Sequence, residues 1–323
     1  MRIAIVGAGA IGGFLGAYLS RSGEDVILIA RGPHLAAMRS RGVTVRSAGD
    51  EFTAHPECTE DMNAISRAEV VFLTLKAHSV PSVAEAIGSA LADDACIVGA
   101  QNGIPWWYFD DRHLESVDPG GVIARNISYN KVVGCIAYPA VQVIEPGVIE
   151  HLESNRFSLG EPDGSRSERV QAISSMLVKA GLKAPVQTRI RNEIWLKLLG
   201  NATLNPLSAL TRATLAQIVT SPVTRDLVRT LMEEVDAVAS ALGVEVPLTI
   251  EKRMAGAAAT GEHRTSMLQD LEAGRPLEVD ALVGAVVELA DGAGVAVPSL
   301  RVVYKLTKLL DEARRAGNSR AQL

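Results

Sequence analysis

Cysteine is scarce in this sequence of 323 residues, which holds only Cys58, Cys96 and Cys135. The three are widely spaced, odd in number and outside any CxxC pair, so the sequence predicts neither a disulfide framework nor a zinc knuckle. The six histidines form no HExxH motif and give no metal-binding spacing. We therefore expect reduced, buried thiols and no metal site.

An excess of basic charge and long apolar runs are also lacking. The formal net charge is -5 at pH 7, which gives no positive field for nucleic acid or for an anionic membrane. No apolar stretch is long enough to span a bilayer, and a first expected strand from residue 2 leaves no room for a signal peptide. These features predict a cytoplasmic protein without a nucleic-acid or membrane partner.

The first residues carry a specific motif. A short apolar run leads into a glycine turn, Gly7-x-Gly9-x-x-Gly12, and then into a helix-like stretch from Ala10 and Ile11. Gly7 permits a sharp turn, Gly9 leaves space for a pyrophosphate, and Gly12 allows close packing of helix on strand. Since the phosphates would lie at the positive N-terminus of that helix, the pattern predicts a dinucleotide site.

Strand and helix patterns alternate after this turn. The sequence predicts a helix over Ile11 to Arg21 and parallel strands over Asp25 to Ala30, Glu69 to Leu75 and Ala95 to Gly99, the last two apolar enough to be buried on both faces. Shorter, antiparallel strands between Val132 and Leu159 are expected to finish the same sheet. With 47% hydrophobic residues, the chain is large enough for two domains.

Polar residues follow the ends of these strands, where ligands bind in open parallel sheets. They are Lys76, and Asn102 within Gln101 to Gly103. The second strand runs into Arg31 rather than an acidic residue. Because an arginine there accommodates a 2′-phosphate, we predict NADP(H) as the cofactor, unless Arg31 is only a solvated surface residue.

The composition changes near Arg189, beyond which helical patterns dominate. The sequence predicts an α/β Rossmann-type domain over residues 1–188 and an all-α domain over residues 189–323. The final stretch from Gly317 to Leu323 is polar and is expected to fray. The expected helices are Asn192 to Ala202, Pro222 to Leu242, Pro247 to Met254, Val279 to Ala290 and Leu300 to Ala316.

One helix of the second half carries a polar stripe. Glu193, Lys197, Asn201 and Asn205 recur every four residues and so share one face. The stripe either faces solvent with a Glu193 to Lys197 ion pair, or lines a site where the lysine protonates the oxygen of a reduced ketone. Pro206 is expected to break or kink the helix and aim the Asn205 amide into a cleft.

Further polar residues come later in the chain, with Ser266 in Ser-Met-Leu-Gln-Asp and Glu278 and Asp280 in Glu-x-Asp. One of the two acids suffices as a helix N-terminal residue. Together these motifs closely resemble the ketopantoate reductase family. The motifs are Gly7-x-Gly9-x-x-Gly12, Arg31, Thr74-Leu-Lys76-Ala, Asn102-Gly103, Glu193-x-Trp195-x-Lys197-x-x-x-Asn201-x-x-x-Asn205-Pro-Leu, Ser266-Met-Leu-Gln-Asp and Glu278-x-Asp280.

The resemblance implies a Rossmann-type domain, an all-α domain and, between them, NADPH-dependent reduction of a 2-oxo acid, foremost ketopantoate to pantoate on the route to pantothenate and coenzyme A. By resemblance, Lys197 is the general acid, Glu278 binds a substrate hydroxyl and the cofactor, and Ser266 helps to hold the carboxylate. The resemblance gives the other polar residues positioning roles: Asn102 contacts cofactor and substrate, Lys76 lies near the nicotinamide ribose, and Asn201 and Asn205 orient the substrate.

Two departures leave the substrate open. Leu215 stands where some members of the family carry a further asparagine, and the segment Ile104 to Phe109 contains four consecutive aromatic residues. If Trp106 and Trp107 line the site, they favour a bulkier or more apolar 2-oxo acid; otherwise they belong to the core. A non-enzymatic NADPH sensor is a further alternative, and a homodimer is among the assemblies that the sequence allows.

Overall fold

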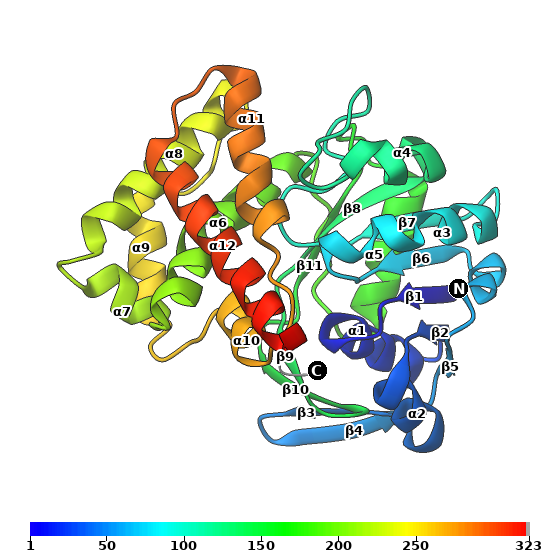
Figure 1. Ribbon diagram of the computed structural model, residues 1–323. Coiled ribbons are helices and arrows are strands. Elements are labelled where there is room, and N and C mark those ends of the chain that lie inside the picture. Colours follow the sequence, from blue (N-terminus) through cyan, green and yellow to red (C-terminus); the bar gives the residue numbers. More distant parts are fainter. Residues whose placement is uncertain (321–323) are drawn as a thin grey trace. The chain divides into compact units, whose positions relative to one another are not determined.

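The computed structural model describes residues 1–320 of the chain and divides into two compact units (Figure 1). Unit 1 comprises Met1–His113 and Asp118–Ile190. Unit 2 comprises Leu114–Val117 and the chain from Arg191 onward. The chain therefore enters unit 2 briefly, returns to unit 1, and then builds the helical second half.

A seven-stranded sheet forms the centre of unit 1, in the order β11-β8-β7-β6-β1-β2-β5. Its strands pair in parallel except for β11, which is antiparallel to β8. Strands β6, β7 and β8 are buried throughout, which explains their continuous apolar sequences. The strands are β1 (Arg2–Val6), β2 (Asp25–Ile29), β5 (Glu57–Thr59), β6 (Val70–Leu73), β7 (Cys96–Gly99), β8 (Val132–Ala137) and β11 (Phe157–Gly160).

Helices alternate with these strands, which confirms the predicted α/β class. Close packing has a direct cause at Gly16 of the first helix, where a Cβ would meet the Leu28 side chain and lie 3.2 Å from Ile5 Cδ1. The helices of unit 1 are α1 (Ala10–Arg21), α2 (Gly32–Arg41), α3 (Ala84–Ala90), α4 (Val122–Asn126) and α5 (Glu168–Lys179). Short 3-10 turns cover Met62–Arg67, Ala77–Ser79, Pro81–Val83, Pro119–Gly121 and Tyr129–Lys131.

A second sheet corrects the expectation for the segment between Val132 and Leu159. Only β8 and β11 finish the main sheet, whereas β9 (Ala140–Glu145) and β10 (Val148–Glu153) join β3 (Val43–Ser47) and β4 (Asp50–Ala54) in the order β4-β3-β10-β9. Strand β10 pairs in parallel with β3, about a hundred positions earlier in the chain. Local sequence patterns indicate strands but not their partners, so the second sheet was not predicted.

Unit 2 is helical, as predicted, and within residues 1–320 no helix is long and apolar enough to cross a membrane. The short helices α7 and α10 were not predicted, and the stretch predicted as a helix from Val279 opens with a π-helical turn, η6. The helices are α6 (Ile190–Thr211), α7 (Leu215–Thr220), α8 (Arg225–Ala241), α9 (Ile250–Ala259), α10 (Ser266–Glu272), η6 (Asp280–Gly284), α11 (Ala285–Ala293) and α12 (Pro298–Arg320).

Two expectations concern helix ends. Helix α6 continues through Pro206 to Thr211, so the expected break is wrong, whereas a kink at this position stays a prediction. Residues 202–209 are all buried, and this tertiary packing outweighs the hydrogen bond that proline removes. Helix α12 extends over residues 317–320, whose fraying stays a prediction, and residues 321–323 lie outside the described part of the chain.

The segment Leu114–Val117 is held within unit 2 by one carboxylate. Glu288 of α11 accepts hydrogen bonds from the backbone N–H groups of Glu115 (2.8 Å) and Ser116 (2.9 Å) and from the Ser116 hydroxyl (2.6 Å). Because hydrogen bonds to a charged group are the stronger class, Glu288 anchors Glu115 and Ser116 to α11.

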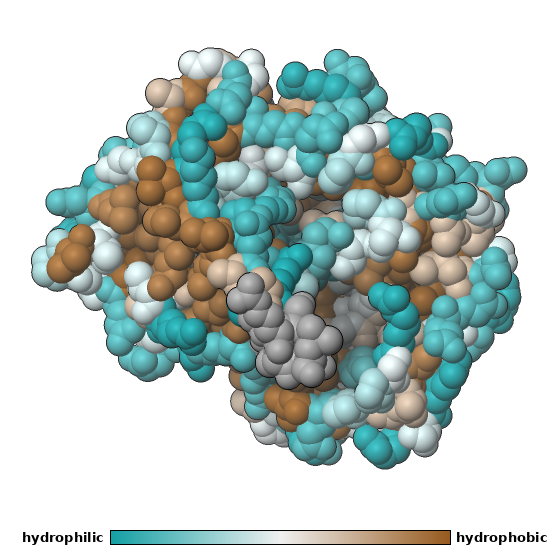
Figure 2. All heavy atoms as spheres, viewed as in Figure 1, coloured by the Kyte–Doolittle hydropathy of each residue, from teal (hydrophilic) through white to brown (hydrophobic). Residues whose placement is uncertain are grey.

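Helix α12 has an apolar outer side. Val302, Leu306 and Leu309 are 58%, 51% and 60% exposed, and their spacing places them on one side of the helix. Figure 2 shows apolar side chains gathered on the visible face of this helical unit. By contrast, Leu300 and Val303 are buried, so α12 contributes to the core of unit 2 through its other side.

The thiols match the expectation of reduced cysteines. Cys58, Cys96 and Cys135 are free, and Cys96 and Cys135 are buried while Cys58 is half-buried. Burial raises the pKa of the Cys58 and Cys96 thiols to about 11. Both are therefore protonated at neutral pH and are poor nucleophiles.

Candidate active site

The glycine turn joins β1 to α1 as the sequence predicts. Gly7 has a φ of +99°, and a Cβ there would lie 2.7 Å from the Leu75 backbone nitrogen. At Gly12 a Cβ would overlap Thr74 Oγ1 and lie 2.5 Å from the Gly7 carbonyl oxygen. At exposed Gly9 the nearest atom is 4.0 Å away, so this position faces open space. Gly7 and Gly12 are thus required by packing, whereas Gly9 leaves room for a ligand.

The N-terminus of α1 offers donors to that space. The first intrahelical hydrogen bond runs from the Gly13 nitrogen to the Gly9 carbonyl at 2.8 Å. The backbone N–H groups of Ala10, Ile11 and Gly12 precede it and have no intrahelical acceptor, and no side chain caps this end of the helix. Free N–H groups, a positive helix end and an open glycine fit the pyrophosphate of a dinucleotide.

Four parallel strands end at the same edge as this turn. The register pairs Val6 with Ile29 and with Leu73, and Leu73 with Gly99. The residues that follow these ends therefore lie along one edge of the main sheet. They are Gly7 after β1, Arg31 after β2, half-buried Lys76 after β6 and half-buried Asn102 after β7.

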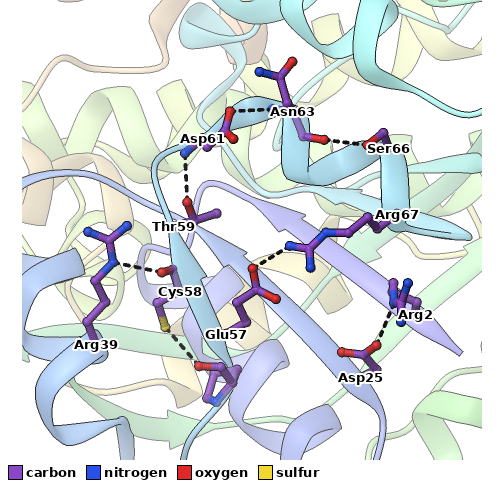
Figure 3. Close-up of polar contacts among 11 residues, drawn as sticks. Arg2, Asp25, Arg39, Glu57, Cys58, Thr59, Asp61, Asn63, Ser66 and Arg67 are labelled. Atoms are coloured by element: carbon purple, nitrogen blue, oxygen red, sulfur yellow. Dashed lines mark hydrogen bonds and ion pairs between the residues drawn. The ribbon is translucent and has the colours of Figure 1, made fainter.

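Arg31 is available for a ligand at this edge. It is exposed, and within residues 1–320 its guanidinium makes no hydrogen bond or ion pair. Two nearby arginines are committed to protein partners (Figure 3): Arg39 donates to the Cys58 carbonyl at 2.9 Å, and Arg67 pairs with Glu57 at 2.5 Å. Arg31 is thus the arginine of this region that can serve a phosphate.

His34 of α2 was not predicted as a functional residue, and it connects α2 to the turn between β9 and β10. Its Nδ1 accepts a hydrogen bond from the Gly147 N–H at 3.0 Å, in the turn between β9 and β10. Because a backbone N–H can only donate, Nδ1 carries no proton and the ring is neutral. Burial lowers the pKa of His34, and the carbonyl of Ala8 in the glycine turn opposes this shift. A lone histidine has no spacing that reveals such a role.

His34 makes the stability of unit 1 depend on pH. The group is a base whose folded pKa lies below its usual value of about 6.5, so the unfolded chain binds the proton first as the pH falls. We expect the free energy of unfolding to decrease below about pH 6.5, and less so in a His34→Asn variant. Urea unfolding at about pH 7.5 and about pH 5.5 measures the free energy of unfolding of the wild type and of the variant. An equal pH dependence in the two proteins would contradict the role of His34.

The aromatic segment belongs to the core of unit 1. Trp106, Trp107 and Tyr108 are 6%, 1% and 2% exposed. The Trp107 ring lies over Gly99 of β7 and Gly134 of β8, where added Cβ atoms would come within 2.7 and 2.5 Å of it. These side chains fill space above the sheet, so they give no support to a bulkier substrate.

In unit 2, α6 carries the predicted polar stripe. Glu193, Lys197 and Asn201 are half-buried on one face of this helix, and Asn205 is 6% exposed. The neighbouring Trp195 and the leucines of α6 are buried in the core. A face that is neither core nor fully solvated suits residues that contact a ligand.

Later residues of the site also have defined places in unit 2. Exposed Ser266 begins α10, whose cap is the hydroxyl of Thr265, 3.2 Å from the Leu268 nitrogen. Half-buried Glu278 lies just before η6. Asp280 lies in the first turn of η6, which fits the expectation of one acid at a helix N-terminus. Its carboxylate accepts hydrogen bonds from the Tyr304 hydroxyl (2.9 Å) and from Lys308 Nζ (2.5 Å) of α12.

Comparisons with known proteins agree with this architecture. Residues 3–164 match the family model described as ketopantoate reductase PanE/ApbA, and residues 189–311 match its C-terminal counterpart. The chain belongs to the ketopantoate reductase family. The boundary between the two family models lies close to that between the two units, at Ile190 and Arg191.

Individual members of the ketopantoate reductase family are similar over nearly the whole chain. A 2-dehydropantoate 2-reductase of Mesorhizobium japonicum is 46% identical over 96% of this chain and 98% of its own length. Among solved structures, a PanE/ApbA family ketopantoate reductase from Ralstonia eutropha has a TM-score of 0.86 at 28% identity, with 98% and 100% of the two chains covered. A 2-dehydropantoate 2-reductase from Geobacter metallireducens has a TM-score of 0.85 at 29% identity, with 96% of this chain and 99% of that chain covered.

Proposed function

We propose that this protein reduces ketopantoate to pantoate with NADPH, as a step toward pantothenate and coenzyme A. The observation that carries the proposal is the 46% identity to a 2-dehydropantoate 2-reductase across 96% of the chain. The glycine turn and the polar stripe of α6 support it, because they provide what a dinucleotide and a reducible carbonyl each need.

The glycine turn and Arg31 would hold the nicotinamide cofactor, which when bound would supply a hydride to the keto carbon of the substrate. Reduction leaves negative charge on the carbonyl oxygen, and the ammonium group of Lys197 stabilises this charge and donates the proton that completes the hydroxyl. Lys197 is suited to this task because it lies half-buried on α6, a helix of 22 residues with a packed opposite side. A rigid support holds the donor where the charge develops.

The other residues of the proposed site orient the reactants. Asn201 and Asn205 follow Lys197 at intervals of four residues on α6 and present amides to the substrate. The remaining assignments follow the family resemblance: Asn102 contacts cofactor and substrate, Lys76 the nicotinamide ribose, Glu278 a substrate hydroxyl and the cofactor, and Ser266 the carboxylate.

Arg31 sets the preference for NADPH over NADH in this proposal. Its exposed guanidinium at the end of β2 can bind a 2′-phosphate by charge-assisted hydrogen bonds. We expect Arg31→Ala to lower kcat/KM for NADPH by about 10- to 100-fold with little change for NADH. Steady-state kinetics with both cofactors measure this, and Arg166→Ala, an exposed arginine of unit 1, is the matched control. A wild type that prefers NADH would rule the assignment out.

The substrate is tested by kinetics on a panel of 2-oxo acids. Ketopantoate should give the highest kcat/KM with NADPH. Since Trp106 and Trp107 are in the core, Leu215, half-buried at the start of α7, is the remaining departure from the family pattern that leaves the substrate open. A higher kcat/KM for a branched or aromatic acid would establish that alternative. Tight NADPH binding without reduction of any acid would point to a sensor instead.

A further inference from the structure

An arginine of α9 lies directly on a glycine of α6. An added Cβ at Gly200 would lie 2.5 Å from Cζ and 2.6 Å from Nε of Arg253, and would overlap Nη2. Gly200 is buried although it stands on the half-buried face of the helix, because the guanidinium covers it. Only glycine at this position lets the arginine approach so closely.

This contact places a second cation, the Arg253 guanidinium, beside the polar stripe. Gly200 follows Lys197 by three residues, and residues three or four apart are neighbours on a helix surface. Asn201, also on the stripe, lies on the other side of the same turn. The planar guanidinium of Arg253 therefore covers the position on α6, Gly200, that neighbours Lys197.

We propose that Arg253 binds the carboxylate of the 2-oxo acid whose keto oxygen Lys197 protonates. The inference rests on the proposed function and adds a residue that the sequence motifs did not include. In a 2-oxo acid the carboxylate is bonded to the keto carbon, so the groups that bind the two must themselves be neighbours. Arginine suits the role because its fork of N–H donors matches a carboxylate in a two-point contact.

The first test separates carboxylate binding from a structural role. Arg253→Met should raise the KM for ketopantoate by about 10- to 100-fold, while kcat and the KM for NADPH change little. The preference for ketopantoate over its neutral methyl ester should fall by a similar factor, because the ester offers no charge to the arginine. The control is Lys252→Met, which removes the same charge from the exposed neighbouring position of α9.

A second variant reaches the same contact from α6. Gly200→Ala leaves the charge of Arg253 intact but pushes the guanidinium away from the helix, so it should raise the KM for ketopantoate in the same direction. Alanine has a higher helix propensity than glycine, so helix propensity gives no reason for the melting temperature of the Gly200→Ala variant to fall. In an Arg253→Met background, Gly200→Ala should have little further effect, since the contact is already gone.

The outcomes distinguish this inference from the proposed function. A wild type that reduces ketopantoate, with an Arg253→Met variant of unchanged KM and unchanged acid-to-ester preference, overturns the role of Arg253 and leaves the function standing. Additive effects of the two substitutions on KM would also overturn it. A wild type that reduces no 2-oxo acid overturns both.

Discussion

Replacement of Lys197 by methionine is expected to lower kcat by at least about 100-fold, the usual contribution of a general acid. The side chain keeps its length and its apolar stem but can neither stabilise the developing oxyanion nor give it a proton. Binding of NADPH should be unchanged, because the proposed cofactor contacts belong mainly to the glycine turn and to Arg31. Stopped-flow or steady-state oxidation of NADPH measures the loss.

Two further variants make the result specific. Lys197→Arg keeps the positive charge but has a pKa too high for ready proton transfer, so it should recover little of the turnover. Lys305→Met removes an exposed lysine of α12 and should behave as the wild type. Turnover of Lys197→Met near the wild-type value would exclude the lysine as the acid.

Substitutions in the glycine turn are expected to give the second large effect. At Gly12 we expect a loss of stability, and at Gly9 a loss of affinity for the cofactor. Gly12→Ala should destabilise unit 1 by about 1 to 3 kcal/mol, the usual cost of overpacking. The added Cβ would overlap Thr74 Oγ1 and lie 3.0 Å from Ile5 Cγ2, both in the packed region beneath the turn. The loss should appear in urea unfolding without cofactor.

Gly9→Ala is the matched comparison. A Cβ there has only the Gly7 carbonyl oxygen at 4.0 Å, so the stability of the free protein should not change. Since the same atom would occupy the space proposed for the pyrophosphate, the Kd for NADPH should rise by about 10-fold or more. Loss of stability in Gly9→Ala with unchanged Kd would contradict the assignment of this space to the phosphates.

Much of unit 1 could be predicted because its signals are local. The apolar run of β1, the glycine turn and α1 are consecutive in the chain, and buried parallel strands such as β6 and β7 have continuous apolar sequences. The second sheet depends instead on β10 meeting β3, which lies far away in the sequence. Pairing between distant strands is decided by tertiary packing, which no period of two or 3.6 records.

The helical half shows a similar division. The apolar periodicity of α8 and α12 is local and was predicted, whereas the continuation of α6 through Pro206 depends on the burial of residues 202–209. In the π-helical turn that begins at Asp280, the aspartate accepts hydrogen bonds from Tyr304 and Lys308, which lie more than twenty residues later in the chain. The structural effects of Pro206 and Asp280 therefore depend on residues that are close in space but distant in the sequence.

Residues of the candidate site divide in the same way. Gly7, Gly9 and Gly12 form a motif with fixed spacing, and the stripe around Lys197 follows the helical period, so both stand out in the sequence. His34 and Arg253 are single residues in unremarkable helices. Their positions beside Gly147 and Gly200 follow only from the folded chain.

The most direct measurement is the stoichiometry of NADPH oxidation with ketopantoate, followed by identification of the product. We predict one NADPH oxidised for each ketopantoate consumed and pantoate as the product, with the reaction abolished or reduced at least about 100-fold by Lys197→Met. Unchanged NADPH in the presence of wild-type protein and excess ketopantoate would contradict the proposed function.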